Sequence, residues 1–76
     1  MKIKATFQIE GRVDFEKVIE GEDNQEIWNS LISELSTLFP ECDKNEITLE
    51  KKMPDPIFVA RNGAEETLCE VVCEPI

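Results

Sequence analysis

Hydrophobic and polar side chains alternate along the first ten residues. Apolar residues occupy positions 3, 5, 7 and 9, and polar residues occupy the even positions. A period of two is typical of a strand with one buried face. Gly11 permits a turn, and Val13 and Phe15 continue the alternation before it shifts by one residue near Lys17. We predict a hairpin in which residues 12–20 pair with the first strand and a bulge lies near Lys17, one long bent strand being the alternative.

A helical pattern occupies the next part of the chain. Asp23 can accept hydrogen bonds from the first unpaired backbone amides, and Glu26, three residues later, completes the pattern of a capping box. Pro40 marks the end of the helix. Apart from Glu34, the polar side of the helix carries no acid after its first turn. Because this side is nearly uncharged, it is a candidate surface for contact with a partner. The apolar stripe, at helical spacing, comprises Ile27, Trp28, Leu31, Ile32, Leu35, Leu38 and Phe39.

A further strand is predicted after the helix and a loop over residues 40–45. Ile47, Leu49 and Met53 alternate with polar residues, and Lys51 is the polar exception on the inner face. Residues 53–56 include two prolines, which donate no hydrogen bonds to a sheet. We therefore predict an extended connector or turn there.

The end of the chain is typical of a second hairpin. Residues 57–61 form a short strand, and residues 65–73 form the returning strand. Between them, Asn62 and Gly63 both tolerate positive φ and favour a tight turn. The residues of the returning strand that are predicted to face the helix are Thr67, Cys69, Val71 and Cys73.

These elements predict the order strand, strand, helix, strand, strand, strand. An antiparallel sheet of four to five strands packed on one helix is a small α+β two-layer sandwich. The second face of the sheet would be solvated, in agreement with the polar half of each strand. Leu68 and Val72 would lie there among carboxylates, either as a contact surface or covered because the strand changes direction.

Length and charge narrow the class of protein. The chain has 76 residues, of which 41% are hydrophobic, so we expect one domain, residues 1–76, with one small core. It carries 8 basic and 17 acidic residues, a net charge of −9, and no His. This charge disfavours direct binding to nucleic acid or to anionic membranes. The expected partner is a basic protein.

The ends and the apolar runs bear on location. The N-terminus lacks the apolar segment of a signal peptide, and no apolar run approaches the roughly 18 residues of a membrane span. We therefore expect a cytoplasmic protein that does not bind membranes.

The three cysteines, Cys42, Cys69 and Cys73, are expected to be reduced, because their number is odd and no export signal is present. On a strand, Cys69 and Cys73 would share a face but lie roughly 13 Å apart. That separation is too large for a disulfide or for one shared zinc ion. We expect no metal site and no cofactor.

The chain lacks the residues that catalysis commonly uses. Without His, neither the helix serines nor Cys42 has the base that nucleophilic catalysis requires. The three glycines are isolated and form no phosphate-binding loop. We predict that the protein is not an enzyme.

Acidic residues concentrate in three segments. Residues 16–26 carry five acids and one base, residues 41–50 four acids and one base, and residues 65–74 four acids and no base. Such charge either keeps a small domain soluble or attracts a basic partner. The predicted contact residues are Glu20, Glu22, Asp23, Glu26, Glu41, Asp43, Glu65, Glu66, Glu70 and Glu74.

Two functions from different classes follow. The first is a non-catalytic inhibitor or modulator that occupies the nucleic-acid groove of a basic protein, its carboxylates standing in for phosphates. Phage-encoded inhibitors of CRISPR effectors are a functional class of this size and charge, although no motif links the chain to them. The alternative is a structural or regulatory module, or a homodimer, that acts through hydrophobic contacts.

Overall fold

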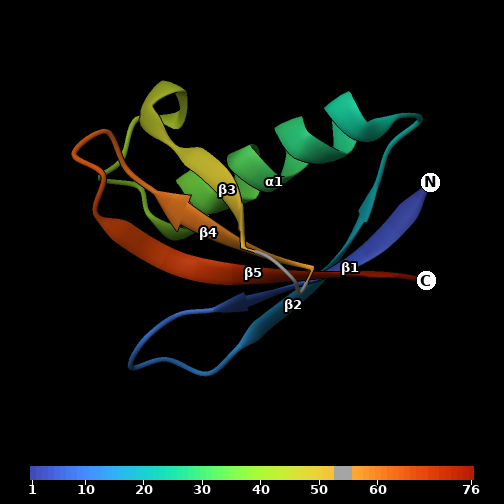
Figure 1. Cartoon of the computed structure of the whole chain (residues 1–76), viewed down its shortest axis with the longest axis horizontal. Helices are drawn as coiled ribbons and strands as arrows, with labels where there is room; N and C mark the ends of the chain where they lie inside the picture. Colours follow the sequence, from blue (N-terminus) through green and yellow to red (C-terminus); the bar gives the residue numbers. More distant parts are fainter. Residues whose placement is uncertain (53–55) are drawn as a thin grey trace.

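The computed structural model describes residues 1–52 and 56–76. Within those ranges, five strands form one antiparallel sheet in the order β2-β1-β5-β4-β3, and one α-helix lies across a single face of it (Figure 1). The predicted α+β architecture and element order are confirmed. The elements are β1 (Lys2–Gln8), β2 (Phe15–Glu20), α1 (Asn24–Leu38), the 3-10 helix η1 (Lys44–Glu46), β3 (Thr48–Lys52), β4 (Ile57–Arg61) and β5 (Thr67–Pro75).

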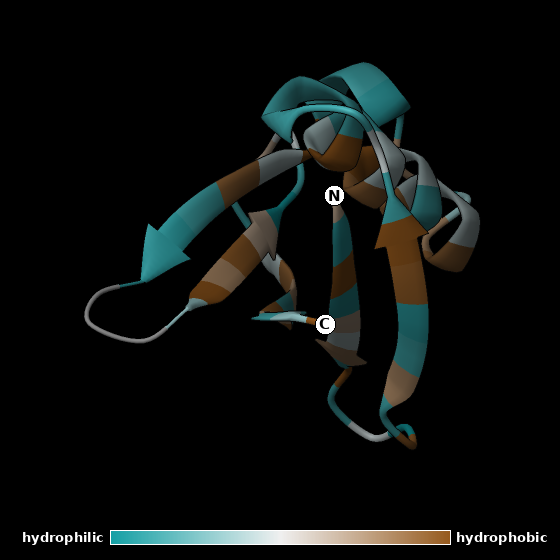
Figure 2. Cartoon of the chain, turned by 90° about the vertical axis from the view of Figure 1, so that its right-hand side faces the viewer, coloured by the Kyte–Doolittle hydropathy of each residue, from teal (hydrophilic) through white to brown (hydrophobic). Residues whose placement is uncertain are grey.

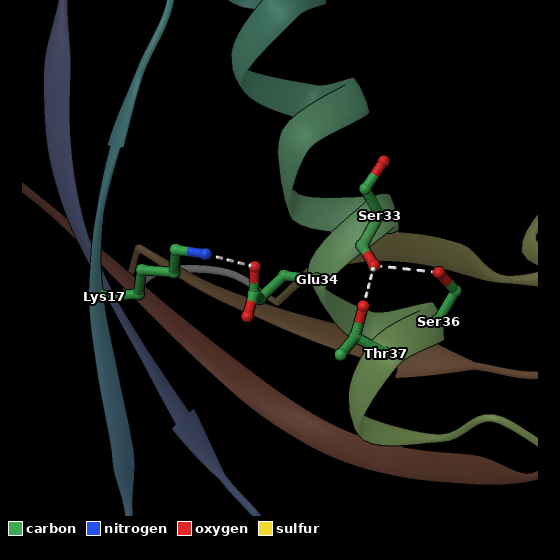
Figure 3. A network of polar contacts seen from close by, with 5 residues as sticks. All are labelled: Lys17, Ser33, Glu34, Ser36 and Thr37. Atoms are coloured by element: carbon green, nitrogen blue, oxygen red, sulfur yellow. Dashed lines mark hydrogen bonds and ion pairs between the residues drawn. The ribbon is translucent and has the colours of Figure 1, made fainter.

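Strands β1 and β2 form the predicted hairpin, but the predicted bulge is wrong. The register runs without a break from Phe7 opposite Phe15 to Lys2 opposite Glu20. Lys17 therefore lies on the face that the helix covers. Its long side chain reaches the helix, where Nζ lies 2.7 Å from an Oε of Glu34 (Figure 3). An inward lysine is tolerated because its apolar stem can pack while its charged end remains paired at the margin.

Helix α1 begins as the sequence predicts. Asp23 accepts a hydrogen bond from the backbone N–H of Glu26 at 2.9 Å. The Glu26 side chain accepts one from the backbone N–H of Glu22, also at 2.9 Å, so the reciprocal bond falls one residue before the cap. The helix ends at Leu38, before Pro40, which cannot donate the next helical bond.

The polar side of α1 uses part of its hydrogen-bonding capacity internally. The hydroxyls of Ser36 and Thr37 donate to the backbone carbonyl of Ser33, at 2.8 and 3.2 Å (Figure 3). Such bonds from serine and threonine to the preceding turn are common in helices. These two side chains are therefore less available to a partner than their position on the polar side predicts.

The core lies between α1 and the inner face of the sheet. Hydrophobic and hydrophilic bands alternate along the strands (Figure 2), as a half-buried sheet requires. Trp28 departs from the predicted stripe: it is 37% exposed and meets Phe58 edge-on, with ring centroids 5.8 Å apart, because it lies at the margin of the helix. The buried apolar residues are Ala5, Phe7, Ile19, Ile27, Leu31, Ile32, Leu35, Phe39, Ile47, Leu49, Ala60, Cys69 and Val71.

The third strand agrees with its predicted pattern as far as the structure describes it. Leu49 is buried, and Lys51, the polar exception, is exposed. Met53 lies outside the described residues, as do the next two positions of the predicted connector.

The second hairpin is present, but its turn differs from the prediction. Gly63 has no positive φ, and the left-handed residue is Glu65, with φ at 63°. The Asn62 side chain accepts hydrogen bonds from the backbone N–H groups of Ala64 and Glu66 at 2.9 and 3.0 Å. Asparagine commonly closes a turn in this way. The side chain of Asn62, rather than a two-residue turn, therefore sets the shape of this loop.

An irregular register between β4 and β5 moves two predicted residues. Ala60 pairs with Cys69, whereas the next residue, Arg61, pairs with Thr67, so Leu68 is skipped. Thr67 is therefore exposed beside Arg61 instead of facing the helix, and Leu68 packs against the core. Val72 does lie on the sheet face opposite α1, which we call the outer face.

Glu65→Gly is expected to stabilise the protein by about 0.5–1 kcal/mol. A left-handed backbone costs a residue with a Cβ about 1–2 kcal/mol, and glycine loses part of that gain through the greater entropy of its unfolded chain. The N–H and carbonyl of Glu65 make its loop hydrogen bonds, so glycine retains them. Chemical denaturation measures the change. Glu66→Gly, next to it but without positive φ, should lower stability, and equal effects of the two variants would contradict the explanation.

Candidate functional site

Four predicted contact residues gather at the N-terminal end of α1. Glu20 ends β2, Glu22 and Asp23 form the connection, and Glu26 lies in the first helical turn. Asp23 and Glu26 cap the helix, and Glu20 lies 3.1 Å from Lys2. Acidic groups here are also favoured by the helix dipole. In the part of the chain that the structure describes, the side-chain carboxylate of Glu22 makes no hydrogen bond or ion pair, and only its backbone N–H donates, to Glu26. We call these four residues the N-terminal acidic cluster.

Four others lie at the opposite end of the helix. Glu41 and Asp43 follow α1, and Glu65 and Glu66 belong to the loop between β4 and β5. We call them the C-terminal acidic cluster. Asp43 accepts a hydrogen bond from the N–H of Asn45 at 2.9 Å and so caps η1.

Cys42 lies near carboxylates of three segments: the end of α1, η1 and the β4–β5 loop. Burial raises the pKa of its thiol, and the carboxylates of Glu41, Glu46 and Glu66 raise it further. The helix end, η1 and the β4–β5 loop therefore bring like charges together. Glu46 belongs to this region although we did not predict it as a contact residue. Its side chain lies against Gly63, where an added Cβ would come within 3.0 Å of a Glu46 Oε atom.

The two clusters are separated by the length of α1. The helix has 15 residues, which at 1.5 Å per residue is about 22 Å. The sequence did not determine whether the acidic segments form one surface or several. The structure places eight of the ten predicted residues in two groups at the ends of one helix.

The remaining two predicted residues lie elsewhere. Glu70 and Glu74 are on the outer face of the sheet, where the register sets Glu74 opposite Lys4. Glu70 lies 3.8 Å from Nζ of Lys52. Strand alternation places them there, because their neighbours Cys69, Val71 and Cys73 point to the helix. They are therefore not part of either cluster.

Bases and carboxylates are nearly balanced on the outer face of the sheet, whereas carboxylates predominate in the rest of the chain. Among the described residues, the outer face carries four bases and five carboxylates: Lys2, Lys4, Lys52, Arg61, Glu16, Glu20, Glu50, Glu70 and Glu74. Glu20, at the end of β2, borders both this face and the N-terminal acidic cluster. The rest of the chain has twelve carboxylates against four bases. Most of the net charge of −9 therefore belongs to residues away from the outer face.

An apolar recess of about 380 Å³ adjoins the N-terminal acidic cluster. Ile27, Trp28 and Leu31 line it from α1, and Ile3 and Phe58 from the sheet. A second recess, lined by Glu20, Glu22 and Glu26, lies beside the apolar one, and Met1 lines both. The apolar recess was not predicted from the sequence, because Trp28 was assigned to the core stripe. The relevant signal is its size, since tryptophan is rarely buried completely.

The cysteines lie in environments that keep them protonated. Burial, and then the nearby carboxylate of Glu70, raises the pKa of the Cys69 thiol to about 11. Burial also raises the pKa of Cys73. A thiol is a nucleophile or metal ligand in its thiolate form, which these environments disfavour.

The raised pKa of Cys69 predicts a loss of stability at high pH. The unfolded thiol releases its proton near the ordinary value of 9.0, whereas the folded one retains it up to about 11. Between these values the unfolded state binds fewer protons, so stability falls as pH rises. Denaturation at a series of pH values measures this slope. Cys69→Ala should flatten it, and Cys42→Ala, a change at a half-buried thiol, should flatten it less. An unchanged slope in Cys69→Ala would refute the assignment.

In residues 1–52 and 56–76, no three His, Cys, Asp or Glu side chains form a group able to hold a metal ion. The same ranges contain no helix with the length and apolar character needed to cross a bilayer.

No family model, curated protein or solved structure matches this chain.

Proposed function

We propose that this protein is a non-catalytic inhibitor or modulator that binds a basic, nucleic-acid-binding protein in the cytoplasm. The observation that carries the proposal is the pair of acidic clusters at the two ends of α1. Their carboxylates would take the place of phosphates in the groove of the partner. Phage-encoded inhibitors of CRISPR effectors are one functional class that works in this way.

The spacing of the clusters supports this proposal. About 22 Å corresponds to six or seven base-pair steps of 3.4 Å along a duplex. A groove that binds such a length of nucleic acid presents basic side chains over the same distance. The two clusters can therefore meet both ends of that groove at once, while the nearly uncharged side of α1 lies between them.

The charge of the chain supports the same partner. Complementary charge raises association rates and excludes wrong partners more than it increases final affinity. A chain with a net charge of −9 is repelled by nucleic acid and attracted to proteins that bind it. The apolar recess beside the N-terminal acidic cluster could then take up an apolar side chain of the partner, since buried anchors commonly dominate the energy of an interface.

Affinity capture from a host lysate, followed by competition, tests the function. The tagged protein is expected to retain a basic nucleic-acid-binding protein at low salt and to lose it as salt rises, because screening weakens charge pairs. Duplex DNA or RNA should displace the protein from its purified partner. Capture that persists in high salt, or binding that nucleic acid leaves unchanged, would contradict mimicry.

The alternative function, an interaction module that works through hydrophobic contacts, is favoured by a different observation. Val18 is 51% exposed on the outer face, and Val72 lies half-buried on the same face. A partner bound there would be retained in high salt.

A further inference from the structure

The outer face of the sheet has an apolar centre. Val18 of β2, Val72 of β5, and Ile57 and Val59 of β4 all point to this side, because their neighbours in each strand point to the helix. Val18 is 51% exposed, and the other three are half-buried. Within the described residues, α1 packs on the inner face (Figure 1), so these four side chains have no layer above them.

Charges on this face are largely paired with one another. Lys2 lies 3.1 Å from Glu20, Arg61 lies 3.5 Å from Glu50, and Lys52 lies 3.8 Å from Glu70. Lys4 is half-buried between Val18 and Glu74 in the register, so its stem extends the apolar centre. The nine charged residues of the face sum to −1.

We propose that this face binds a second copy of the same chain. Two molecules that each carry −9 repel one another, and the repulsion is strongest where carboxylates are unpaired. Exposed apolar side chains also lie elsewhere, Val13 and Trp28 among them, but the outer face combines a cluster of four apolar side chains with nearly balanced charge. A symmetric dimer brings the same patch of both copies together, which requires a surface that tolerates its own charges. Alternating, paired lysines and glutamates meet that requirement.

The expected assembly is a four-layer sandwich of helix, sheet, sheet and helix. Two sheets pack face to face about 10 Å apart, with their strands turned by about 30°. Five strands spaced about 4.8 Å apart make a face roughly 24 Å wide. Its strands of five to nine residues are roughly 17–30 Å long at about 3.3 Å per residue, so the face covers on the order of 400–700 Å². That area lies below the roughly 800 Å² per partner of a standard interface, so the dimer should be weak and reversible.

The dimer would leave both copies of α1 on the outside, facing in opposite directions. Each copy would then present its own pair of acidic clusters, and the assembly would be bivalent. Two linked binding surfaces raise avidity for a partner that itself has two sites. The dimer does not rest on the proposed function, since it forms without any partner.

Sedimentation of the purified protein tests the proposal. Over a range of about 1–300 µM, the apparent mass should rise from that of a monomer to that of a dimer. Raising NaCl from about 50 to 500 mM should strengthen association, because salt screens the repulsion between two acidic copies. This response is opposite in sign to the one expected for binding to a basic partner. A monomer throughout the range at both salt concentrations, or association weakened by salt, would overturn the dimer.

Two valines of the same type provide the variant and its control. Val18→Asp puts a carboxylate into the proposed interface and should weaken dimerisation at least about tenfold. Val13→Asp makes the same change at a residue that is 91% exposed in the turn between β1 and β2, and should leave dimerisation within about twofold. Equal dissociation constants for Val18→Asp and the unmodified protein would refute this face as the interface.

A third variant keeps the test decisive if Val18→Asp does not fold. Val59→Thr retains a β-branched side chain suited to a strand and adds one hydroxyl to the outer face. Circular dichroism should match the unmodified protein, and dimerisation should weaken about fivefold. A folded Val59→Thr protein that dimerises unchanged would also refute the proposal.

Discussion

Phe7→Ala is expected to leave much of the protein unfolded at room temperature. The Phe7 side chain is fully buried on β1, where it lies opposite Val71 of β5 and Phe15 of β2. Truncating a buried phenylalanine costs about 3–5 kcal/mol. A domain of this size has a total stability of about 3–5 kcal/mol. The mutation therefore consumes most or all of the margin, and circular dichroism with chemical denaturation will measure the loss.

Phe15→Ala is the matched control. Its ring lies 5.8 Å from that of Phe7 and belongs to the same inner face, but it is 37% exposed at the end of the hairpin. We expect a loss of about 1 kcal/mol, since much of the ring is already in contact with water. Equal losses for the two alanine variants would show that burial does not distinguish these positions.

Glu22→Gln combined with Glu41→Gln is expected to weaken the partner complex about a hundredfold. Each substitution removes one charge from one of the acidic clusters at the ends of α1. A loss of about 1.4 kcal/mol at each end is tenfold in affinity. Because the ends lie about 22 Å apart, the two losses should add. Affinity can be measured by titrating the protein with the captured partner and recording the fluorescence of Trp28. This residue is the only tryptophan in the sequence, and its recess adjoins the N-terminal acidic cluster.

The double variant Glu16→Gln and Glu50→Gln controls for net charge. It changes the charge by the same amount but on the outer face, where Glu50 already pairs with Arg61. Partner affinity should stay within about threefold when measured well below the concentration at which dimers would form. If both double variants weaken binding equally, total charge rather than the two clusters determines recognition.

Local patterns in the sequence were sufficient for the α-helix and the five strands, although not for η1, which lies partly in the predicted loop over residues 40–45. The spacing of apolar residues identified the helix. Asp23 and Pro40 marked its two ends, because the capping and the termination of a helix are local effects. The alternation in residues 2–10 likewise identified β1. The sheet and its antiparallel pairing then followed from the need to cover one apolar face of each element.

Contacts between elements explain where the patterns within single elements failed. The shift near Lys17 was interpreted as a bulge, but Lys17 keeps the regular register because it finds Glu34, which belongs to another element. Leu68 was left either exposed on the outer face or covered, because the sequence does not reveal the skipped residue opposite Arg61 that turns it toward the core. The first outcome depends on a residue 17 positions away, and the second on how β4 pairs with β5 across their hairpin.

The candidate site was likewise predictable in its composition but not in its arrangement. The sequence gives the number of carboxylates, but strand order decides which of them meet. Glu66 comes close to Cys42 because the β4–β5 loop and the end of α1 lie together, whereas Glu70, four residues later, is on the other face of the sheet. Glu46 joins the C-terminal region through its contact with Gly63, a tertiary contact that charge counting cannot detect.

The strand order also determines when this protein can fold during its synthesis. Of these five strands, β5 leaves the ribosome last, yet it lies at the centre of the sheet, between β1 and β4. Until it emerges, the β1–β2 and β3–β4 pairs share no strand edge, and each exposes backbone groups that invite pairing with other chains. Pairing β1 with β5, which lie far apart in the sequence, is also entropically slow. We therefore expect the two hairpins of the nascent chain to remain separate until β5 inserts between them.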